Sequence, residues 1–511
     1  MTIRALVSVS DKTGLVDFVR RLHTMGIEII STGGTMKTLM SAGIPVTYVG
    51  DVTGFPEIMD GRVKTLNPLI HGGILAVRDN AEHRAAMQQH GIGAIDLVVV
   101  NLYPFRETVA NPAATLTEAV ENIDIGGPAM IRAAAKNFRY VTVVVNPQRY
   151  EQVLQNLEQT GVVDHELRMA LAREAYAHTS EYDACIARYL SESMGEGPFS
   201  DKLHLVYDKL MDLRYGENPH QQAAFYRTAG TGRGIAQARQ LHGKELSYNN
   251  IVDLEAAWTL VQEFAEPAAA IIKHTNPCGT GIGTTIGEAY QSAYEADPVS
   301  AFGGIVALNR TADATVAEKI STLFAEAVVA PAFSEESLMI LTAKKNIRLL
   351  EMSDSGVEDM VVSKHVSGGL LVQQADHTAG DDPDRWQTVT KRQPTPEEKQ
   401  QLAFAWKVVK HVKSNAIVVA KGFQTVGVGA GQMNRVGAAE IALRQAGANA
   451  QGAVLASDAF FPFADTVEAA AQAGITAVVQ PGGSMRDEES IAAADKHGMA
   501  MIFTGIRHFK H

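Results

Sequence analysis

The sequence of 511 residues predicts a soluble α/β protein with more than one domain. Its length exceeds the roughly 100–200 residues of an ordinary domain. Hydrophobic residues make up 46% of the chain and charged residues 20%, a balance typical of globular proteins. In residues 3–146 short β-rich runs alternate with helical patterns. This alternation predicts a doubly wound parallel sheet with helices on both faces.

The alternation can be followed element by element. Strands are expected where β-branched and apolar residues cluster, at 5–9, 27–30, 46–49, 97–100 and 141–145. Helical patterns lie between them near 14–25, 35–42, 81–90 and 128–137. Ligands of doubly wound folds bind beyond the carboxyl ends of the strands, so polar residues that follow these strands are candidate site residues.

Two polar stretches divide the chain. Residues 147–193 have a helical pattern that ends in a glycine-containing stretch at 193–202, where we expect the boundary between domains 1–198 and 199–511. A second polar stretch at 375–386 divides the larger part into lobes of about 204–375 and 385–511. Each lobe contains an Ala-Trp helix, an Ala-Ile strand and a glycine-rich turn, a repetition that indicates duplication or the chance recurrence of a common α/β pattern.

Cysteine count, apolar runs and charge exclude several classes of protein. Only Cys185 and Cys278 occur, so a disulfide framework is excluded and the reducing cytoplasm is favoured. The first residues contain too short an apolar stretch for a secretory signal, and the longest apolar runs reach only strand length, so no membrane association is expected. A net charge of -12 without long basic runs disfavours binding to nucleic acid.

Polar clusters follow the first two expected strands. Backbone N–H groups of a glycine pair at a helix N-terminus, together with hydroxyl groups and a lysine, make a phosphate cradle. The pattern matches neither a Walker loop nor GxGxxG, and a polar turn with a helix cap is the alternative. The candidate residues are Ser10, Asp11, Lys12, Thr32, Gly33, Gly34 and Thr35.

Further polar groups of the first domain lie in later loops and at one helix. A carboxylate, a phenol, an amide and a lysine in one crevice could move protons during a ring closure. The two cations of the loop 62–65 have a simpler alternative, because exposed Arg and Lys are usually only solvated. The candidates are Arg62, Val63, Lys64, Thr65, Asn101, Tyr103, Asp124, Ile125 and Lys136.

Lys273 and His274 are the leading catalytic pair of the second part. They follow an expected strand at 268–272, and a charged lysine lowers the pKa of a neighbouring imidazole and keeps it a neutral base. A hydrogen-bonded histidine at a strand end is the alternative. Cys278 resembles part of a zinc-deaminase motif, but Gly281 replaces the second cysteine and no His-x-Glu run lies in this lobe, which opposes a zinc site.

Other motifs of the second part offer groups for ligand binding. Arg214 and Tyr215 could grip a phosphate and stack on a heterocycle, although Gly and Asn-Pro nearby also suit a plain turn. Asn415 could offer an amide to a carbonyl oxygen. The remaining candidates are Arg435 in a glycine-rich segment, and Phe460 and Asp465 in an aromatic run that also suits a core.

Together these motifs resemble the AICAR transformylase/IMP cyclohydrolase family of bifunctional purine biosynthesis enzymes. The resemblance runs essentially from end to end. It rests on SVSDKTGLV, STGGT, GRVKTLNP, NLYPF, IDIGGPAMIRAAAKN, LRYGENPHQ, KHTNPCG, SAFGGIVALN, KSNA, GAGQMNRV, SDAFFPF and IRHFKH.

The resemblance implies two consecutive reactions. A C-terminal tandem of cytidine-deaminase-like lobes would transfer a formyl group from the co-substrate 10-formyltetrahydrofolate to AICAR, and a methylglyoxal-synthase-like N-terminal domain would close formyl-AICAR to IMP with loss of water. It also implies a homodimer with the transformylase site shared between subunits, and no metal. A nucleotide sensor without turnover, or a cyclohydrolase joined to a deaminase, are the competing interpretations.

The resemblance also implies roles for single residues. His274 would be the base of formyl transfer, Lys273 would tune it and Asn415 would steer the formyl group. Lys136 would transfer protons in the cyclohydrolase site, with Tyr103 close by, and the other candidates of the first domain would bind nucleotide. The residues implied to hold AICAR or folate are Arg214, Tyr215, Gly303, Glu326, Asn415, Arg435, Phe460, Asp465 and Arg507.

Overall fold

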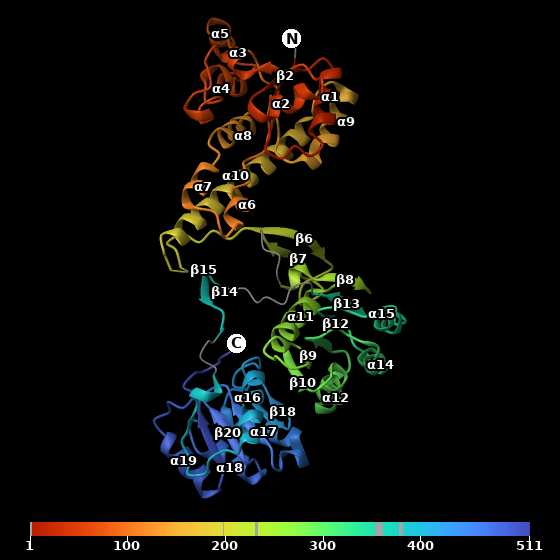
Figure 1. Cartoon of the computed structure of the whole chain (residues 1–511), viewed down its shortest axis with the longest axis vertical. Coiled ribbons are helices and arrows are strands. Elements are labelled where there is room, and N and C mark those ends of the chain that lie inside the picture. The colour runs from red at the N-terminus through yellow and green to blue at the C-terminus, as the bar shows by residue number, and fades with distance from the viewer. Residues whose placement is uncertain (1–2, 198, 230–233, 353–360, 378–381) are drawn as a thin grey trace. The chain divides into compact units, whose positions relative to one another are not determined.

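The computed structural model describes residues 3–197, 199–229, 234–352, 361–377 and 382–511. The chain forms two compact units, Met1–Val206 and Tyr207–His511 (Figure 1). The boundary expected from the sequence falls at residue 198, which lies outside the described residues. No helix in the described part of the chain is both long and apolar enough to cross a membrane.

The first unit is built on a parallel sheet of order β3-β2-β1-β4-β5. Every neighbouring pair of strands in it is parallel, and Leu6 of β1 pairs with Ile30 on one side and Val98 on the other. The predicted parallel sheet is confirmed. The strands are β1 (Arg4–Ser8), β2 (Glu28–Ser31), β3 (Thr47–Tyr48), β4 (Leu97–Val100) and β5 (Thr142–Val144).

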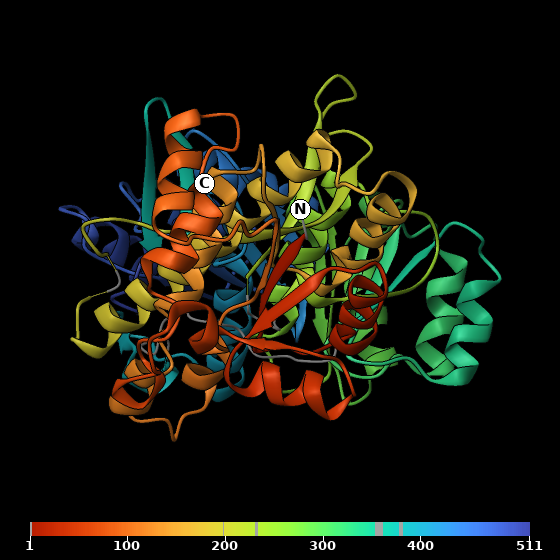
Figure 2. The same ribbon diagram turned by 90° about the horizontal axis from the view of Figure 1, so that it is seen from above.

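Helices cover both faces of this sheet, as its residue pattern requires. Alternate residues of the strands enter two separate cores, with Leu6 and Val98 in one and Val7 and Val99 in the other. Figure 2 shows the red strands between helices. The helices are α1 (Leu15–Thr24), α2 (Gly33–Ser41), α3 (Val49–Thr53), α4 (Pro68–Leu75), α5 (Ala81–Gln89), α6 (Phe105–Ala110), α7 (Leu116–Glu121), α8 (Gly126–Lys136), α9 (Tyr150–Thr160) and α10 (His165–Ser193).

The second unit contains two lobes with the same order of elements. In each lobe a helix precedes an antiparallel strand pair, and three further strands follow with helices between them. The first lobe has α11 (Tyr248–Val261), β9 (Ala268–Lys273), β10 (Asn276–Ile282), α12 (Ile286–Ala296), α13 (Pro298–Ala301), β11 (Ile305–Leu308), α14 (Ala314–Thr322), β12 (Ala327–Ala330), α15 (Glu335–Thr342) and β13 (Arg348–Glu351). The second has α16 (Pro396–Val409), β17 (Ile417–Lys421), β18 (Gln424–Gly429), α17 (Arg435–Ala446), β19 (Val454–Ser457), α18 (Asp465–Gln472), β20 (Ala477–Gln480), α19 (Asp487–Lys496) and β21 (Ala500–Phe503).

The strand orders of the two lobes also match. The order is β10-β9-β11-β12-β13 in the first lobe and β18-β17-β19-β20-β21 in the second. The repeated order supports the duplication predicted from the sequence. The other strands are β8 (Arg239–His242) and β16 (Gln387–Thr388) at the sheet edges, and the pairs β6 (Tyr207–Leu213) with β7 (Ala223–Thr228) and β14 (Val361–Val366) with β15 (Gly369–Gln374).

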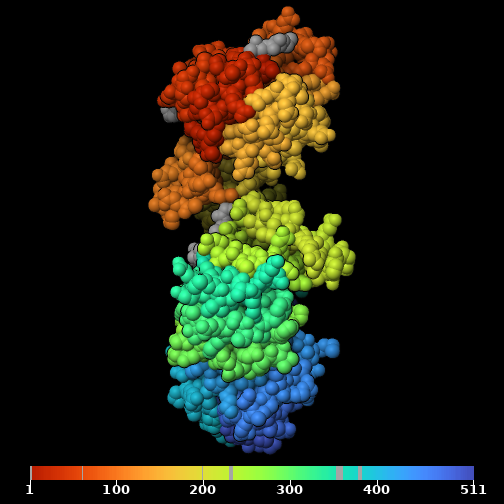
Figure 3. Space-filling view, turned by 90° about the vertical axis from the view of Figure 1, so that its right-hand side faces the viewer, coloured from red at the N-terminus to blue at the C-terminus, as the bar shows by residue number. Residues whose placement is uncertain are grey.

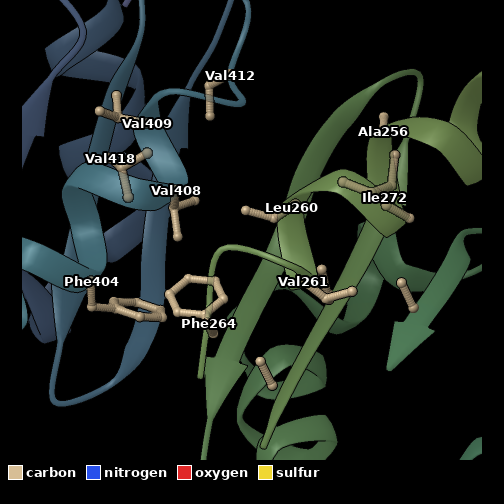
Figure 4. Close-up of a cluster of buried hydrophobic side chains, with 14 of the residues drawn as sticks. Ala256, Leu260, Val261, Phe264, Ile272, Phe404, Val408, Val409, Val412 and Val418 are labelled. Atoms are coloured by element: carbon tan, nitrogen blue, oxygen red, sulfur yellow. The ribbon is translucent and has the colours of Figure 1, made fainter. Parts of the chain in front are cut away.

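The two lobes share one sheet and one core. β10 pairs with β18 at Gly281 and Gln424, which joins both halves into a twelve-stranded sheet. In the core between α11 and α16 the rings of Phe264 and Phe404 lie 5.5 Å apart, and Figure 4 shows them facing each other across the junction. In the space-filling view the green and blue lobes form a continuous surface (Figure 3). Residues from both lobes can therefore contribute to one site.

Candidate functional sites

A cavity of about 620 Å³ in the first unit is lined by residues that follow β1, β2 and β4. The strand order reverses between β1 and β4, which is where ligands of doubly wound folds bind. The cavity brings together most of the residues predicted for this domain. Those that line it are Ser10, Lys12, Thr32, Gly33, Gly34, Thr35, Arg62, Lys64, Thr65, Asn101, Tyr103, Asp124 and Ile125.

Asn101 and Thr35 hold the loops around this cavity. The Oδ1 atom of Asn101 accepts hydrogen bonds from the backbone N–H groups of Ser10 at 2.6 Å and Asp11 at 2.9 Å, and its Nδ2 donates to the Asp11 carbonyl at 3.0 Å. The hydroxyl of Thr35 accepts from the N–H of Val9 and donates to its carbonyl, both at 3.0 Å. These side chains tie the end of β1 to β4 and α2, so their main role is to shape the cavity.

The N-terminus of α2 offers a site for an anion. The side chain of Thr32 does not cap the helix, which leaves the backbone N–H groups of the first turn available. Thr32 is 2% exposed, and its hydroxyl has no hydrogen-bond partner among the residues that the structure describes. The Nζ atom of Lys64 lies 3.7 Å from where a Cβ of Gly33 would be. The N-terminus of α2, the Thr32 hydroxyl and the Lys64 ammonium together fit an oxyanion such as a phosphate.

Asp124 is the acidic group of the cavity, in the connection between α7 and α8. Its Oδ1 accepts a hydrogen bond from the Gly127 backbone N–H at 2.8 Å. Burial raises the pKa of the Asp124 carboxyl, while hydrogen bonds from the backbone of Gly127 and Tyr103 and the charge of Lys64 act in the opposite direction. A Cβ at position 127 would lie 2.5 Å from Asp124 Oδ2, so this close approach requires glycine.

Three residues predicted for this site do not line the cavity. The Asp11 carboxylate accepts hydrogen bonds from the backbone and hydroxyl of Thr13, and Asp11 lines a neighbouring cavity of about 470 Å³. Val63 pairs with Ile58 in an isolated bridge. Lys136 is the exposed last residue of α8, and it lies about 9 Å along the helix beyond Met130, the last residue of α8 that lines the cavity.

In the second unit, Lys273 and His274 lie at the turn between β9 and β10. His274 and Thr275 have φ values of 54° and 65°, in the left-handed region that few non-glycine residues adopt. The backbone N–H of Thr275 donates to Asp253 Oδ1 at 2.7 Å and so holds the turn. The exposed His274 side chain lines a cavity of about 500 Å³ together with Lys273 and Asn276. Backbone strain of this kind clusters at functional sites.

The side chain of Lys273 is held on the side of Gly303. Its ammonium donates to the Phe302 carbonyl oxygen at 2.6 Å. A Cβ on Gly303 would lie 3.9 Å from the Nζ atom, and Gly303 has a φ of 73°, so this predicted site residue does lie beside Lys273. The exposed rings of Phe302 and Phe324 face each other with centroids 5.1 Å apart. This pair offers an exposed apolar surface next to the lysine.

Asn276 joins the His274 turn to the loop that carries Asn415. Its Oδ1 accepts a hydrogen bond from the Lys413 backbone N–H at 2.9 Å, and its Nδ2 donates to the His274 carbonyl at 3.1 Å. The partners of the first bond are 137 residues apart in sequence. Sequence reasoning missed Asn276, although the polar run KHTNPCG that contains it was a sufficient signal to consider it. The contact places two predicted catalytic segments, one from each lobe, side by side.

Arg435 is buried and fully engaged within the second lobe, where the sequence suggested a ligand-binding cation. Its guanidinium forms an ion pair with Asp458, and the two side chains are 4% and 0% exposed. Its Nη1 donates to Ser457 Oγ at 2.9 Å, and its Nη2 donates to Asn415 Oδ1 at 2.6 Å. The Nδ2 of Asn415 donates to the Gln432 carbonyl at 2.7 Å. Arg435 therefore fixes which way the Asn415 amide points.

Replacing Arg435 by lysine is expected to slow the formyl transfer that the resemblance implies about tenfold and to leave the implied cyclisation unchanged, because an ammonium cannot span Asp458 and Asn415 as the planar guanidinium does. Both rates are measured on the same preparation. The control is Arg385→Lys, since the side chain of Arg385 is 75% exposed. Equal loss of both activities would contradict a local role in orienting Asn415.

The other residues predicted for this site have contacts of their own. Glu326 pairs with Arg348 at 2.8 Å, and the guanidinium of Arg507 lies 4.3 Å from the ring centre of Phe509. Within the described ranges no hydrogen bond or ion pair joins them to Lys273, His274 or Asn415. These residues are Arg214, Tyr215, Glu326, Phe460, Asp465 and Arg507.

Cys278, the cysteine of the second unit, is a partly buried thiol. Burial raises the pKa of the Cys278 thiol to about 12, and its Sγ donates a hydrogen bond to the Ile271 carbonyl oxygen at 3.2 Å. Over the part of the chain that the structure covers, no group of three or more His, Cys, Asp or Glu side chains is placed to hold a metal ion.

Comparisons with known proteins match both units. A family model described as an MGS-like domain matches residues 14–129, and one described as AICARFT/IMPCHase bienzyme matches residues 134–445. Two curated relatives are each named "Bifunctional purine biosynthesis protein PurH". The one from Anoxybacillus flavithermus is 59% identical over 515 residues and the one from Shouchella clausii 60% over 513, with 100% of both chains covered in each case. A solved structure titled "Crystal structure of ForH" covers 36% of this chain and 97% of its own at 36% identity, with a TM-score of 0.33.

The first unit is a doubly wound domain with an anion-binding cavity, and the second consists of duplicated lobes that meet at a histidine turn. These features define an α/β enzyme with a candidate site in each unit. The chain belongs to the AICARFT/IMPCHase bienzyme family. It is thus a bifunctional enzyme of purine biosynthesis with AICAR transformylase and IMP cyclohydrolase activities.

Proposed function

We propose that the cavity of the first unit is the IMP cyclohydrolase site and that the second unit carries the AICAR transformylase site. The observation that carries this assignment is the half-buried acid Asp124 in a cavity that also contains an anion cradle. A nucleotide that must close a ring needs both a grip on its phosphate and groups that move protons. The match of residues 14–129 to a domain type distinct from that of the lobes supports the same division.

In the cyclohydrolase site the nucleotide phosphate binds at the N-terminus of α2. Lys64 and the unpaired hydroxyl of Thr32 complete the cradle there. Ring closure joins the carboxamide nitrogen of formyl-AICAR to its formyl carbon and expels the formyl oxygen as water. One proton must therefore leave the carboxamide nitrogen and one the formamido nitrogen, and both must reach the departing oxygen. Asp124 and Tyr103 line the cavity and supply titratable groups for these transfers. Lys136, which the motif predicts as the proton-transfer residue, does not line this cavity, whereas Lys64 does.

In the transformylase site His274 acts as the base and 10-formyltetrahydrofolate is the co-substrate. The 5-amino nitrogen of AICAR forms a bond to the formyl carbon, His274 takes the proton of that nitrogen, and tetrahydrofolate leaves with its own nitrogen protonated. Asn415 has two amide N–H groups and uses one on Gln432, so the other can hold the formyl oxygen. Lys273, fixed on Phe302 beside Gly303, places a positive charge next to the base.

The active form is a homodimer in the cytoplasm. The residues Arg214, Glu326 and Arg507 are implied to hold AICAR or folate, yet in this chain they contact neighbouring side chains, and within the described ranges no hydrogen bond joins them to His274. A site completed by a second copy of the chain accounts for this separation. One experiment tests both the dimer and the shared site. A chain with Arg507 replaced is mixed with a chain with His274 replaced, and formyl transfer returns only if one site takes residues from both subunits.

One experiment tests the proposed function. The purified enzyme incubated with AICAR and 10-formyltetrahydrofolate is expected to form IMP, and incubated with formyl-AICAR alone it is expected to form IMP without folate. Both reactions are followed by absorbance and by chromatography of the nucleotide. Binding of AICAR without any product would instead support a nucleotide sensor, and would overturn both assignments.

A further inference from the structure

Tyr182 of α10 holds the connection that carries Asp124. Its hydroxyl accepts a hydrogen bond from the Asp124 backbone N–H at 2.8 Å and donates one to the Asn122 carbonyl at 3.0 Å. α7 ends at Glu121 and α8 begins at Gly126, so these two bonds clamp the four residues that connect the helices. One hydroxyl thus satisfies a backbone donor and a backbone acceptor on either side of residue 123.

The rest of Tyr182 is fixed as firmly as its hydroxyl. The side chain is 9% exposed, and its ring meets Phe105 of α6 edge to face with centroids 6.2 Å apart. The neighbouring Glu181 pairs with Arg106 at 2.6 Å, which ties α10 to α6 at the same level. Figure 1 shows α10 running beside α8 and α6. The clamp is therefore attached to a helix that cannot shift without breaking an ion pair and an aromatic contact.

Tyr182 acts on the site through Asp124, not through the ligand. It does not line the cavity of about 620 Å³, whereas residues 123–127 do, and it lines the neighbouring cavity of about 470 Å³. Burial raises the pKa of the Tyr182 phenol to about 12, so at neutral pH the hydroxyl keeps the proton that it donates to Asn122. The Asp124 carboxylate is in turn held by the Gly127 N–H at 2.8 Å. Backbone and side chain of the acid are thus fixed independently, the first by Tyr182 and the second by α8.

We propose that Tyr182 is a positioning residue of the cyclohydrolase, which sets the acid Asp124 against the bound nucleotide through the backbone of residues 122–124. This inference rests on the proposed function of the first cavity. Without the hydroxyl, the Asp124 N–H and the Asn122 carbonyl lose their partner, and both recover hydrogen bonds most easily by moving toward water. Displacement of a catalytic group by a fraction of an ångström to 1 Å lowers the rate of the chemical step more than it lowers binding.

The chain provides a matched control for this inference. Tyr189 lies on the same helix, and its ring also meets Phe105 edge to face, with centroids 5.6 Å apart. Its hydroxyl makes no hydrogen bond to any residue that the structure describes. Tyr182→Phe and Tyr189→Phe therefore each remove one phenol hydroxyl from the same helix. The two substitutions differ in whether that hydroxyl contacts the Asp124 segment.

The experiment compares both variants of the full-length enzyme with the wild type in four measurements. They are kcat and KM for cyclisation of formyl-AICAR, the rate of formyl transfer, the stoichiometry of IMP binding by calorimetry, and amide hydrogen exchange of residues 120–130. Tyr182→Phe is expected to lower kcat for cyclisation about tenfold with KM changed less than about threefold, one IMP site per chain, unchanged formyl transfer and faster exchange of this segment. Tyr189→Phe is expected to behave as the wild type.

Three results would overturn the inference. Wild-type kcat in Tyr182→Phe shows that the clamp is not needed. A fall in kcat matched by an equal fall in the number of IMP sites shows loss of folded protein instead of misplacement of Asp124. Equal losses in both variants show that the packing against Phe105, and not the hydroxyl, is responsible. Failure of the proposed function has a different signature, because the wild type itself would then not cyclise formyl-AICAR.

Discussion

Replacing His274 by alanine is expected to lower the rate of formyl transfer by about 10²- to 10⁴-fold, the range that a general base contributes, and to leave cyclisation of supplied formyl-AICAR at the wild-type rate. The amino group of AICAR is a poor nucleophile until its proton is taken. His274 is exposed at the rim of a cavity of about 500 Å³ and held there by a strained turn, which suits a base that must meet a substrate.

The His274→Ala measurement has two safeguards. His497 is an exposed histidine at the end of α19 with no link to the His274 turn, so His497→Ala should keep both activities. The cyclohydrolase activity of the same preparation reports on the folding of the first unit. Retention of formyl transfer in His274→Ala would show that another group takes the proton, and loss of cyclisation as well would contradict separate sites.

The architecture of the first unit was predictable because buried parallel strands have a simple sequence pattern. Such strands are covered on both faces and appear as continuous apolar runs, for example LVVV at 97–100, which is buried throughout. The third strand shrank to Thr47–Tyr48 because α3 begins at Val49. The helices α3, α6 and α7 escaped prediction, since five or six residues are too few to show a helical period.

Site residues were predictable where they follow a strand and unpredictable where their role depends on distant partners. Thr32 follows β2 and Lys273 is the last residue of β9, and both line a cavity at the end of their strand. The roles of Asn276 and Arg435 depend on contacts with Lys413 and Asp458 that no local pattern encodes. A motif alone shows that these residues are present, but the fold decides whether they touch a ligand or orient the group that does.

Lys136 shows the same limit in a single motif. The run IDIGGPAMIRAAAKN suggests one site, but it folds into the end of a connection and the whole of α8. An eleven-residue helix extends roughly 16 Å, so Asp124 and Lys136 lie near its opposite ends. Lys64, from another loop, lies in the cavity with Asp124 and contributes its charge to that carboxyl. The motif thus points to Lys136, and the geometry points to Lys64, as the lysine on which cyclisation depends.

We expect the geometry to prevail: Lys64→Ala should lower kcat for cyclisation about 100-fold, and Lys136→Ala less than about tenfold. Lys64 lies beside the anion cradle and its charge acts on Asp124, so its loss removes attraction for the phosphate and the positive charge that opposes protonation of the carboxyl. KM should therefore rise in Lys64→Ala as well. Lys136, exposed at the far end of α8, has neither contact.

The two lysine variants are measured beside Lys37→Ala, which removes an exposed lysine from α2 without touching the cavity. Formyl transfer should be unchanged in all three variants, because the lysines belong to the first unit and the proposed transformylase site to the second. A loss of cyclisation in Lys136→Ala as large as that in Lys64→Ala would contradict the placement from one chain. It would mean that the prediction from the motif is correct and that Lys136 reaches a cyclohydrolase site that one chain alone does not form. A second subunit would then be part of that site.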